Sequence, residues 1–303
     1  MNLGQAALRS ALDGLDVRAR RIIDGIRSGA HPSNRAGAAV EFDRHRAYQP
    51  GDDLRHLDWR VFARSDRLVL KRARMETALD VMFMMDGSGS MQFESGGVWG
   101  SKQELASAVA EALAWLAADS GDRVAACPCH VSAPQPTAMS GGVDGLSNVV
   151  HMLSRTPANG LKMDLDASAQ VVVRCMRHPG LVLICSDLLD PNIAFRRALG
   201  RLRHAGHDVL VLQILDQSER LFDVPEQVLL QDLEGGGSHR VTAAHIRDDY
   251  LRVLQAHQDE ILSVCRGLHV DHVLLDPHES PIPALRELLQ RRSGGTGMTS
   301  LSG

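Results

Sequence analysis

Short apolar runs alternate with helical patterns from Leu79 to Arg291, and this alternation leaves few folds open to the chain. The apolar runs predict strands over residues 79–86, 122–131, 180–187, 207–215 and 269–276, with weaker strand-like pieces at 226–234 and 238–242. Helix-spaced apolar residues predict helices over residues 101–119, 144–154, 164–177, 192–204, 243–265 and 282–291. Near-continuous apolar strands are typical of a sheet that is covered on both faces. The pattern therefore predicts an α/β fold with a doubly wound, mostly parallel sheet.

The first part of the chain differs from this rhythm and predicts a separate lobe. Residues 3–27 carry apolar side chains at helical spacing, whereas residues 38–76 are dense in charges of both signs. The end of the chain is rich in Gly, Ser and Thr, which favours disorder. We expect a helical and irregular N-terminal lobe over residues 1–78, an α/β domain over residues 79–292 and a disordered tail over residues 293–303.

Composition narrows the class of protein. A net charge of -4 gives no general reason to expect nucleic-acid binding. No apolar run reaches the roughly 18 residues that a membrane span needs, and the N-terminus lacks the pattern of a secretory signal. Five dispersed cysteines favour a reducing compartment over a disulfide framework. We expect a cytoplasmic protein without a membrane span.

Oxygen-bearing side chains follow two of the predicted strands. The strand at 79–86 ends in Asp86, and Ser88 and Ser90 follow at alternate positions. The strand at 180–187 ends in Asp187. If the two strands are neighbours, these groups meet beyond the carboxyl edge of the sheet, where ligands bind in open α/β folds. Such hard oxygens suit Mg²⁺, Mn²⁺ or Ca²⁺, and a cation held by neutral serines can still attract a carboxylate from another molecule. The simpler interpretation is that the Ser/Gly-rich loop is only a turn or a helix cap.

Enzyme motifs are missing from the same stretch. Neither Ser88 nor Ser90 lies in G-x-S-x-G, and the chain has no Walker A sequence or G-x-G-x-x-G opening a helix. We therefore expect a binding protein rather than an enzyme. A metal-dependent hydrolase acting on phosphate esters is the alternative, although a phosphatase would favour a second aspartate where Ser88 stands.

A longer signature precedes the serine loop. The segments Glu41-Phe42-Asp43, 46–60 (Arg-Ala-Tyr-Gln-Pro-Gly-Asp-Asp-Leu-Arg-His-Leu-Asp-Trp-Arg) and Ala63-Arg64 resemble the bacterial domain-of-unknown-function 58 family. Asp86-Gly87-Ser88-Gly89-Ser90 resembles the metal-ion-dependent adhesion site of von Willebrand factor A domains. The resemblance implies a von Willebrand A-like domain, Mg²⁺ or a similar cation held by Asp86, Ser88, Ser90 and Asp187, and a MoxR-type AAA+ ATPase as the partner.

One position departs from the adhesion-site pattern. Met163 stands where such sites normally supply a threonine, and a thioether is a poor ligand for a hard cation. Asp164 or Thr156 is a possible substitute ligand, and Lys162 is a possible built-in cation. The departure also keeps open a third alternative, a scaffold whose site is degenerate and empty.

The charged signature offers a docking surface. Arginines alternate with aspartates over residues 46–64, which is explained either by ion pairs that fix an irregular lobe or by a surface for a partner. We assign the partner-binding role to Arg55 and Arg64.

Overall fold

The computed structural model describes residues 8, 11–12, 14–29, 42–47, 69–73, 78–129, 134–155, 162–189, 192–225, 227–231 and 238–294. The chain divides into two compact units, one formed by residues 1–29 with 79–303 and the other by residues 30–78. In the second unit, the described strands β1 (Phe42–Ala47) and β2 (Val69–Ala73) pair antiparallel. The first unit contains the predicted α/β domain.

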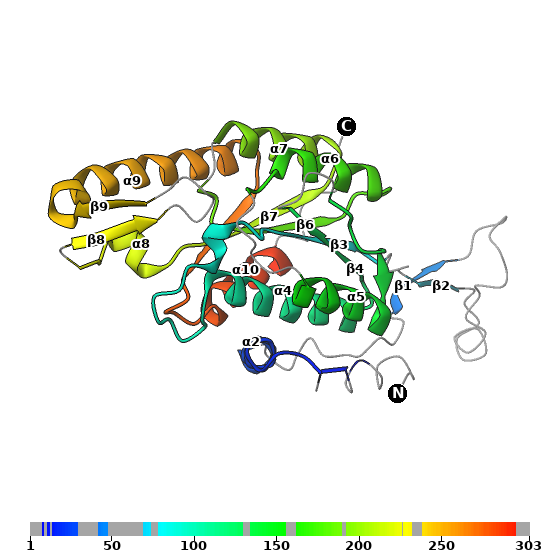
Figure 1. Cartoon of the computed structure of the whole chain (residues 1–303). Helices are drawn as coiled ribbons and strands as arrows, with labels where there is room; N and C mark the ends of the chain where they lie inside the picture. The colour runs from blue at the N-terminus through cyan, green and yellow to red at the C-terminus, as the bar shows by residue number, and fades with distance from the viewer. Residues whose placement is uncertain are drawn as a thin grey trace. The chain divides into compact units, whose positions relative to one another are not determined.

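A six-stranded sheet forms the centre of the first unit (Figure 1). Its strands are β3 (Asp80–Met85), β4 (Arg123–Pro128), β5 (Ser140–Gly141), β6 (Leu181–Ser186), β7 (Asp208–Ile214) and β10 (Asp271–Leu275). Their spatial order is β10-β7-β6-β3-β4-β5, and every neighbouring pair is parallel except the short edge strand β5 against β4. This is the doubly wound order, in which the direction of strand addition reverses between β3 and β6.

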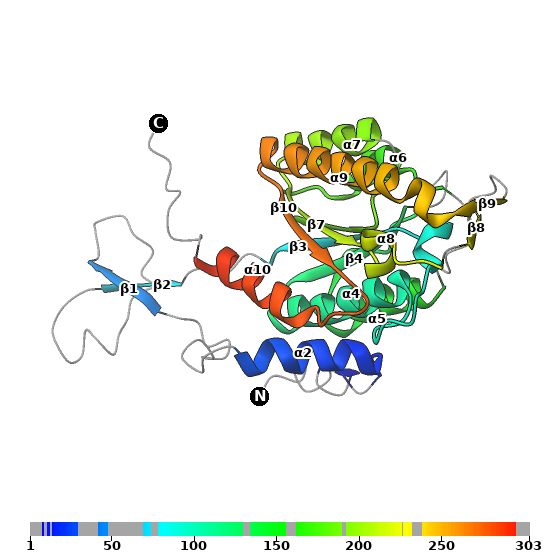
Figure 2. The same cartoon turned by 90° about the vertical axis from the view of Figure 1, so that its left-hand side faces the viewer.

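Helices cover both faces of this sheet (Figures 1 and 2). One face carries α2 (Val17–Gly29), α4 (Lys102–Asp119), α5 (Gly142–Arg155) and α10 (Ile282–Gly294). The other carries α6 (Leu165–Cys175), α7 (Asn192–His204) and α9 (Ala243–Gly267). The strand β3 serves both layers, since Phe83 packs in the first core and Met82 and Met84 pack in the second. The predicted α/β class and parallel sheet are confirmed.

Three short elements were not predicted from the sequence: β5, the 3₁₀ turn η3 (Gly89–Gln92) and α8 (Gln217–Leu221). Outside the main sheet, β8 (Gln227–Gln231) and β9 (Ser238–Thr242) form an antiparallel hairpin, where two strand-like pieces were predicted. Among the described helices, none has the length and apolar character that a membrane crossing requires.

The N-terminal helix packs with the α/β domain and belongs to the same compact unit. Ile22 and Ile23 of α2 are fully buried in the core beneath the sheet. The indole Nε1 of Trp115 on α4 donates to the carbonyl of Leu8 at 3.1 Å. The apolar stripe of α2 therefore covers α4, and only residues 30–78 form a separate unit. The predicted disordered tail lies outside the described residues, apart from the last turn of α10.

Candidate functional site

The two strands that end in Asp86 and Asp187 are neighbours, which is the condition set by the sequence analysis. Met85 at the end of β3 pairs with Cys185 of β6, and the backbone N–H of Asp86 donates to the Cys185 carbonyl at 3.0 Å. These are also the strands between which the strand order reverses. The carboxyl ends of strands at such a reversal are where doubly wound folds bind ligands.

Asp86 is buried at this point and accepts two hydrogen bonds. Its Oδ1 accepts from the backbone N–H of Ser88 at 2.8 Å, and its Oδ2 accepts from the hydroxyl of Ser186 at 2.6 Å. Burial first, and then the negative charge of Asp187, raise the pKa of Asp86 to about 6. The hydroxyl oxygens of Ser88 and Ser90 lie 3.0 Å apart on the same loop. The structure thus brings together Asp86, Ser88, Ser90 and Asp187.

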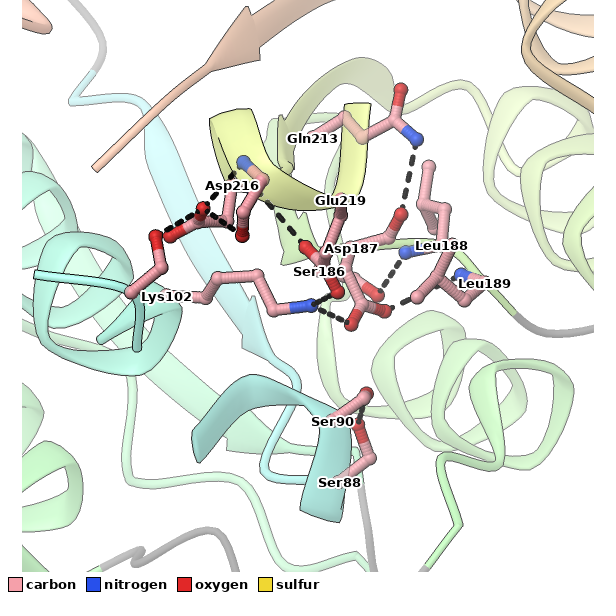
Figure 3. A network of polar contacts seen from close by, with 12 residues as sticks. Ser88, Ser90, Lys102, Ser186, Asp187, Leu188, Leu189, Gln213, Asp216 and Glu219 are labelled. Carbon is pink, nitrogen blue, oxygen red and sulfur yellow. Dashed lines mark hydrogen bonds and ion pairs between the residues drawn. The ribbon is translucent and has the colours of Figure 1, made fainter. Parts of the chain in front are cut away.

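A lysine that sequence reasoning overlooked completes this cluster. The ammonium of Lys102, on the first residue of α4, lies 2.8 Å from Asp187 Oδ2 and 2.8 Å from Glu219 Oε1 (Figure 3). Its side chain is 0% exposed, against 3% for Asp187 and 17% for Glu219. Burial alone would lower the pKa of Lys102, but the two carboxylates outweigh it and raise that pKa. Lys102 is therefore a fixed positive charge inside the site.

Glu219 is held in place from α8. Its Oε2 accepts from the backbone N–H of Asp216, which forms a capping box at the start of this short helix. Burial raises the pKa of Glu219, and the charge of Lys102 partly opposes that rise. The site therefore joins loops that follow β3, β6 and β7.

The loop that carries Asp187 is anchored by two further side chains. The buried amide of Gln213 on β7 donates from Nε2 to the Asp187 carbonyl at 3.0 Å. The ring Nε2 of His257 on α9 lies 2.6 Å from the Leu188 carbonyl. Leu188 itself has a φ of 56°, a left-handed conformation that is unusual for a branched residue. These contacts hold the backbone of the loop that carries the Asp187 carboxylate.

The oxygens on the Asp86 side fit a hard divalent cation. Neighbouring ligands at roughly 2.0–2.1 Å from Mg²⁺ in octahedral geometry lie about 2.8–3.0 Å from each other. The Ser88 and Ser90 hydroxyls, which share a hydrogen bond at 3.0 Å, already have a separation compatible with this spacing, and the Asp86 carboxylate lies beside them. Within the described ranges, no group of three or more His, Cys, Asp and Glu side chains is placed to hold a metal ion. A cation here would therefore depend on the two serine hydroxyls.

The alternatives raised by Met163 are answered in part. The Met163 side chain packs against the core cluster above the sheet, and Asp164 Oδ1 accepts from the backbone N–H of Ala167 as the cap of α6. Lys162 is exposed, so the buried ammonium comes from Lys102 instead. Thr156 lies outside the described residues.

A serine, a histidine and an aspartate meet near the same edge without forming a catalytic triad. Ser95 Oγ donates to Asp216 Oδ1 at 2.5 Å and lies 2.8 Å from His278 Nε2. Asp216 Oδ2 lies 3.6 Å from that same ring nitrogen. In a triad the carboxylate orients the opposite nitrogen, Nδ1, so this geometry does not favour nucleophilic catalysis.

The predicted partner-binding residues Arg55 and Arg64 lie outside the described residues.

One sequence signal could have revealed Lys102. Ser101 and Glu104 form a capping box that marks the start of α4, which puts a lysine in the first turn. The first turn of a helix favours acidic side chains because of the helix dipole. A cation there calls for nearby carboxylates, although nothing in the sequence identifies Asp187 and Glu219 as those partners.

The chain is similar to several known proteins. Residues 44–260 match the family described as "Protein of unknown function DUF58". Uncharacterized proteins of Mycobacterium tuberculosis and Mycobacterium bovis are 30% identical over 264 residues, covering 86% of this chain and 82% of theirs. Among solved structures, the chain matches BatB of Bacteroides thetaiotaomicron at 14% identity and a TM-score of 0.47, over 72% of this chain and 100% of that one. The SpRpn10 VWA domain follows at 10% identity and 0.41, over 74% of this chain and 100% of that one.

Proposed function

Since this chain belongs to the DUF58 family of proteins of unknown function, we propose that it is a non-enzymatic binding protein with a divalent-cation site. Asp86, Ser88 and Ser90 would hold the cation directly or through water, with Asp187 as the nearby second carboxylate. The bound cation would supply positive charge for an acidic side chain of a partner protein. Mg²⁺ is the first candidate, and Mn²⁺ or Ca²⁺ are alternatives.

One observation carries this proposal. Asp86 and the serine pair follow β3, Asp187 follows the adjacent strand β6, and the strand order reverses between these two strands. The Lys102 ammonium pairs with Asp187 and Glu219, and the neighbouring carboxylate of Asp86 has no such partner in the described part of the chain, so the cluster can accept further positive charge. The pKa of Asp86 is raised because, among the side chains that the structure describes, no positive charge offsets its burial.

The proposed partner is a MoxR-type AAA+ ATPase in the cytoplasm, as the resemblance of the signature segment implies. Arg55 and Arg64 would contribute to that interface. Reversing both charges should then weaken the complex without lowering the melting temperature, and an unchanged affinity would remove them from the interface.

Affinity capture from the native host tests the proposal. Wild-type protein should retain the ATPase in Mg²⁺ and release it in chelator, and Asp86→Asn should retain none because the isosteric amide removes the charge. The matched control is Asp80→Asn, since Asp80 lies buried at the opposite end of the same strand and pairs with Arg123. Capture that ignores chelator, or that Asp80→Asn loses equally, would contradict the proposal.

The competing proposals give different outcomes. A metal-dependent hydrolase should turn over generic phosphoester substrates in Mn²⁺, and the binding protein should not. A scaffold with a degenerate site should capture its partner equally with and without chelator.

A further inference from the structure

The Lys102 ammonium lies inside the proposed cation site. Its two contacts are short and buried, and they go to Asp187 Oδ2 and Glu219 Oε1 rather than to Asp86. The other oxygen of Asp187, Oδ1, accepts from the Leu189 backbone N–H at 3.3 Å. Both oxygens of this carboxylate are therefore in use before any ligand arrives.

We propose that Lys102 sets the cation affinity of the site by competing for Asp187. This inference rests on the proposed function, because it describes how the chain controls the same site. A divalent cation beside Ser88 and Ser90 is attracted by the negative charge of Asp187. The ion pair with Lys102 partly neutralises that charge and so weakens the attraction. Glu219 is the second holder of the ammonium, so the lysine keeps a charge partner when its hold on Asp187 weakens.

The residues that take part in this competition lie on three different elements of the fold. Lys102 begins α4, Asp187 follows β6 and Glu219 belongs to the short helix α8 (Figure 3). Loading of the site thus changes how tightly α8 is tied to the loop after β6. The affinity of the site and the position of α8 are linked through a single ammonium group.

A double-mutant cycle separates competition from a general effect of charge. In Lys102→Met the unbranched side chain replaces the lysine stem without its charge, and Asp187 is freed. We expect Mn²⁺, measured by electron paramagnetic resonance or calorimetry, to bind at least about tenfold more tightly, within the usual range of coupling between sites. In an Asp187→Asn background the same substitution should change affinity less than about threefold, because the contested carboxylate is gone.

The outcomes are distinct. Equal gains in Mn²⁺ affinity in both backgrounds would show that Lys102 acts only as a distant charge, and would overturn the competition. The proposed function would still stand in that case, because Mn²⁺ binds. The absence of Mn²⁺ binding in every variant would overturn both.

Where Lys102→Met does not fold, as judged by circular dichroism, Glu219→Gln replaces it. That variant should bind Mn²⁺ about fivefold more weakly, because Lys102 then depends on Asp187 alone, and the effect should vanish in the Asp187→Asn background. A tighter or unchanged affinity in Glu219→Gln would overturn the competition.

Discussion

Removing the buried ammonium should destabilise the fold strongly. In Lys102→Met, two carboxylates that each lie 2.8 Å from the ammonium lose it, and the side chains of Asp187 and Glu219 are only 3% and 17% exposed. Breaking a buried ion pair by deleting one partner costs about 3–5 kcal/mol, because the remaining charge stays buried without compensation. Methionine fills similar space, so little of the loss comes from a cavity.

The loss should also depend on pH. Burial already raises the pKa of Glu219 in the presence of Lys102, and removal of that cation raises it further. A carboxyl whose folded pKa exceeds its unfolded pKa favours folding only while it is protonated, so stability falls as pH rises through the folded value. Each tenfold weakening of the carboxyl as an acid costs about 1.4 kcal/mol above that pH. Lys102→Met should therefore lose less stability at pH 5 than at pH 8.

Urea unfolding in chelator, followed by circular dichroism at both pH values, measures this difference. The double variant Lys102→Met with Glu219→Gln should recover a substantial part of the loss, since the glutamine can still accept from the Asp216 backbone N–H. A loss below about 1 kcal/mol, or an equal loss at both pH values, would refute the claim that Lys102, Asp187 and Glu219 form a buried and interdependent charge cluster.

Three smaller predictions concern core packing, the anchor of the Asp187 loop and the cap of α4. Cys175 is the exposed thiol and the other four cysteines are buried, so a thiol reagent should label one cysteine in the native protein and five in denaturant; rapid labelling of more than one native thiol would contradict the core packing. Gln213→Leu should lower the free energy of unfolding by about 1–3 kcal/mol, because the Asp187 carbonyl loses its buried donor, and an unchanged urea midpoint would show that this anchor is dispensable. Ser101→Ala should cost about 0.5–2 kcal/mol through loss of the cap of α4, whereas a melting temperature equal to wild type would argue against the capping box.

The sheet and its larger helices could be predicted because their periodicities are strong. The strands β3, β6 and β7 are near-continuous apolar runs, and α7 matches its predicted bounds of 192–204. The short helix α8 has five residues and is too brief to show a helical period. The place of α2 was missed because an amphipathic helix predicts a partner without naming it, and that partner, α4, begins more than seventy residues later.

The residues of the candidate site also fall into those that could be predicted from the sequence and those that could not. Asp86 and Asp187 were predicted to meet on the condition that their strands are neighbours, and the pairing of β3 with β6 meets that condition. Lys102 and Glu219 could not be predicted, because their contact depends on where α4 begins and on how α8 caps itself through Asp216. Lys162 was considered because it adjoins Met163, where the adhesion-site pattern has a threonine, but its side chain is exposed and the buried ammonium beside Asp187 belongs to Lys102.

The most direct test of the central claim is Mn²⁺ binding by wild type and by the double variant Ser88→Ala with Ser90→Ala. These substitutions delete two oxygens and no charge, so they isolate the ligand role of the hydroxyls that lie 3.0 Å apart. Ser95→Ala, on the same loop but in contact with Asp216 and His278, is the control. The proposed site predicts one saturable Mn²⁺ per chain in wild type and in the control, and none in the double variant. No binding by wild type, or equal binding by the double variant, would contradict it.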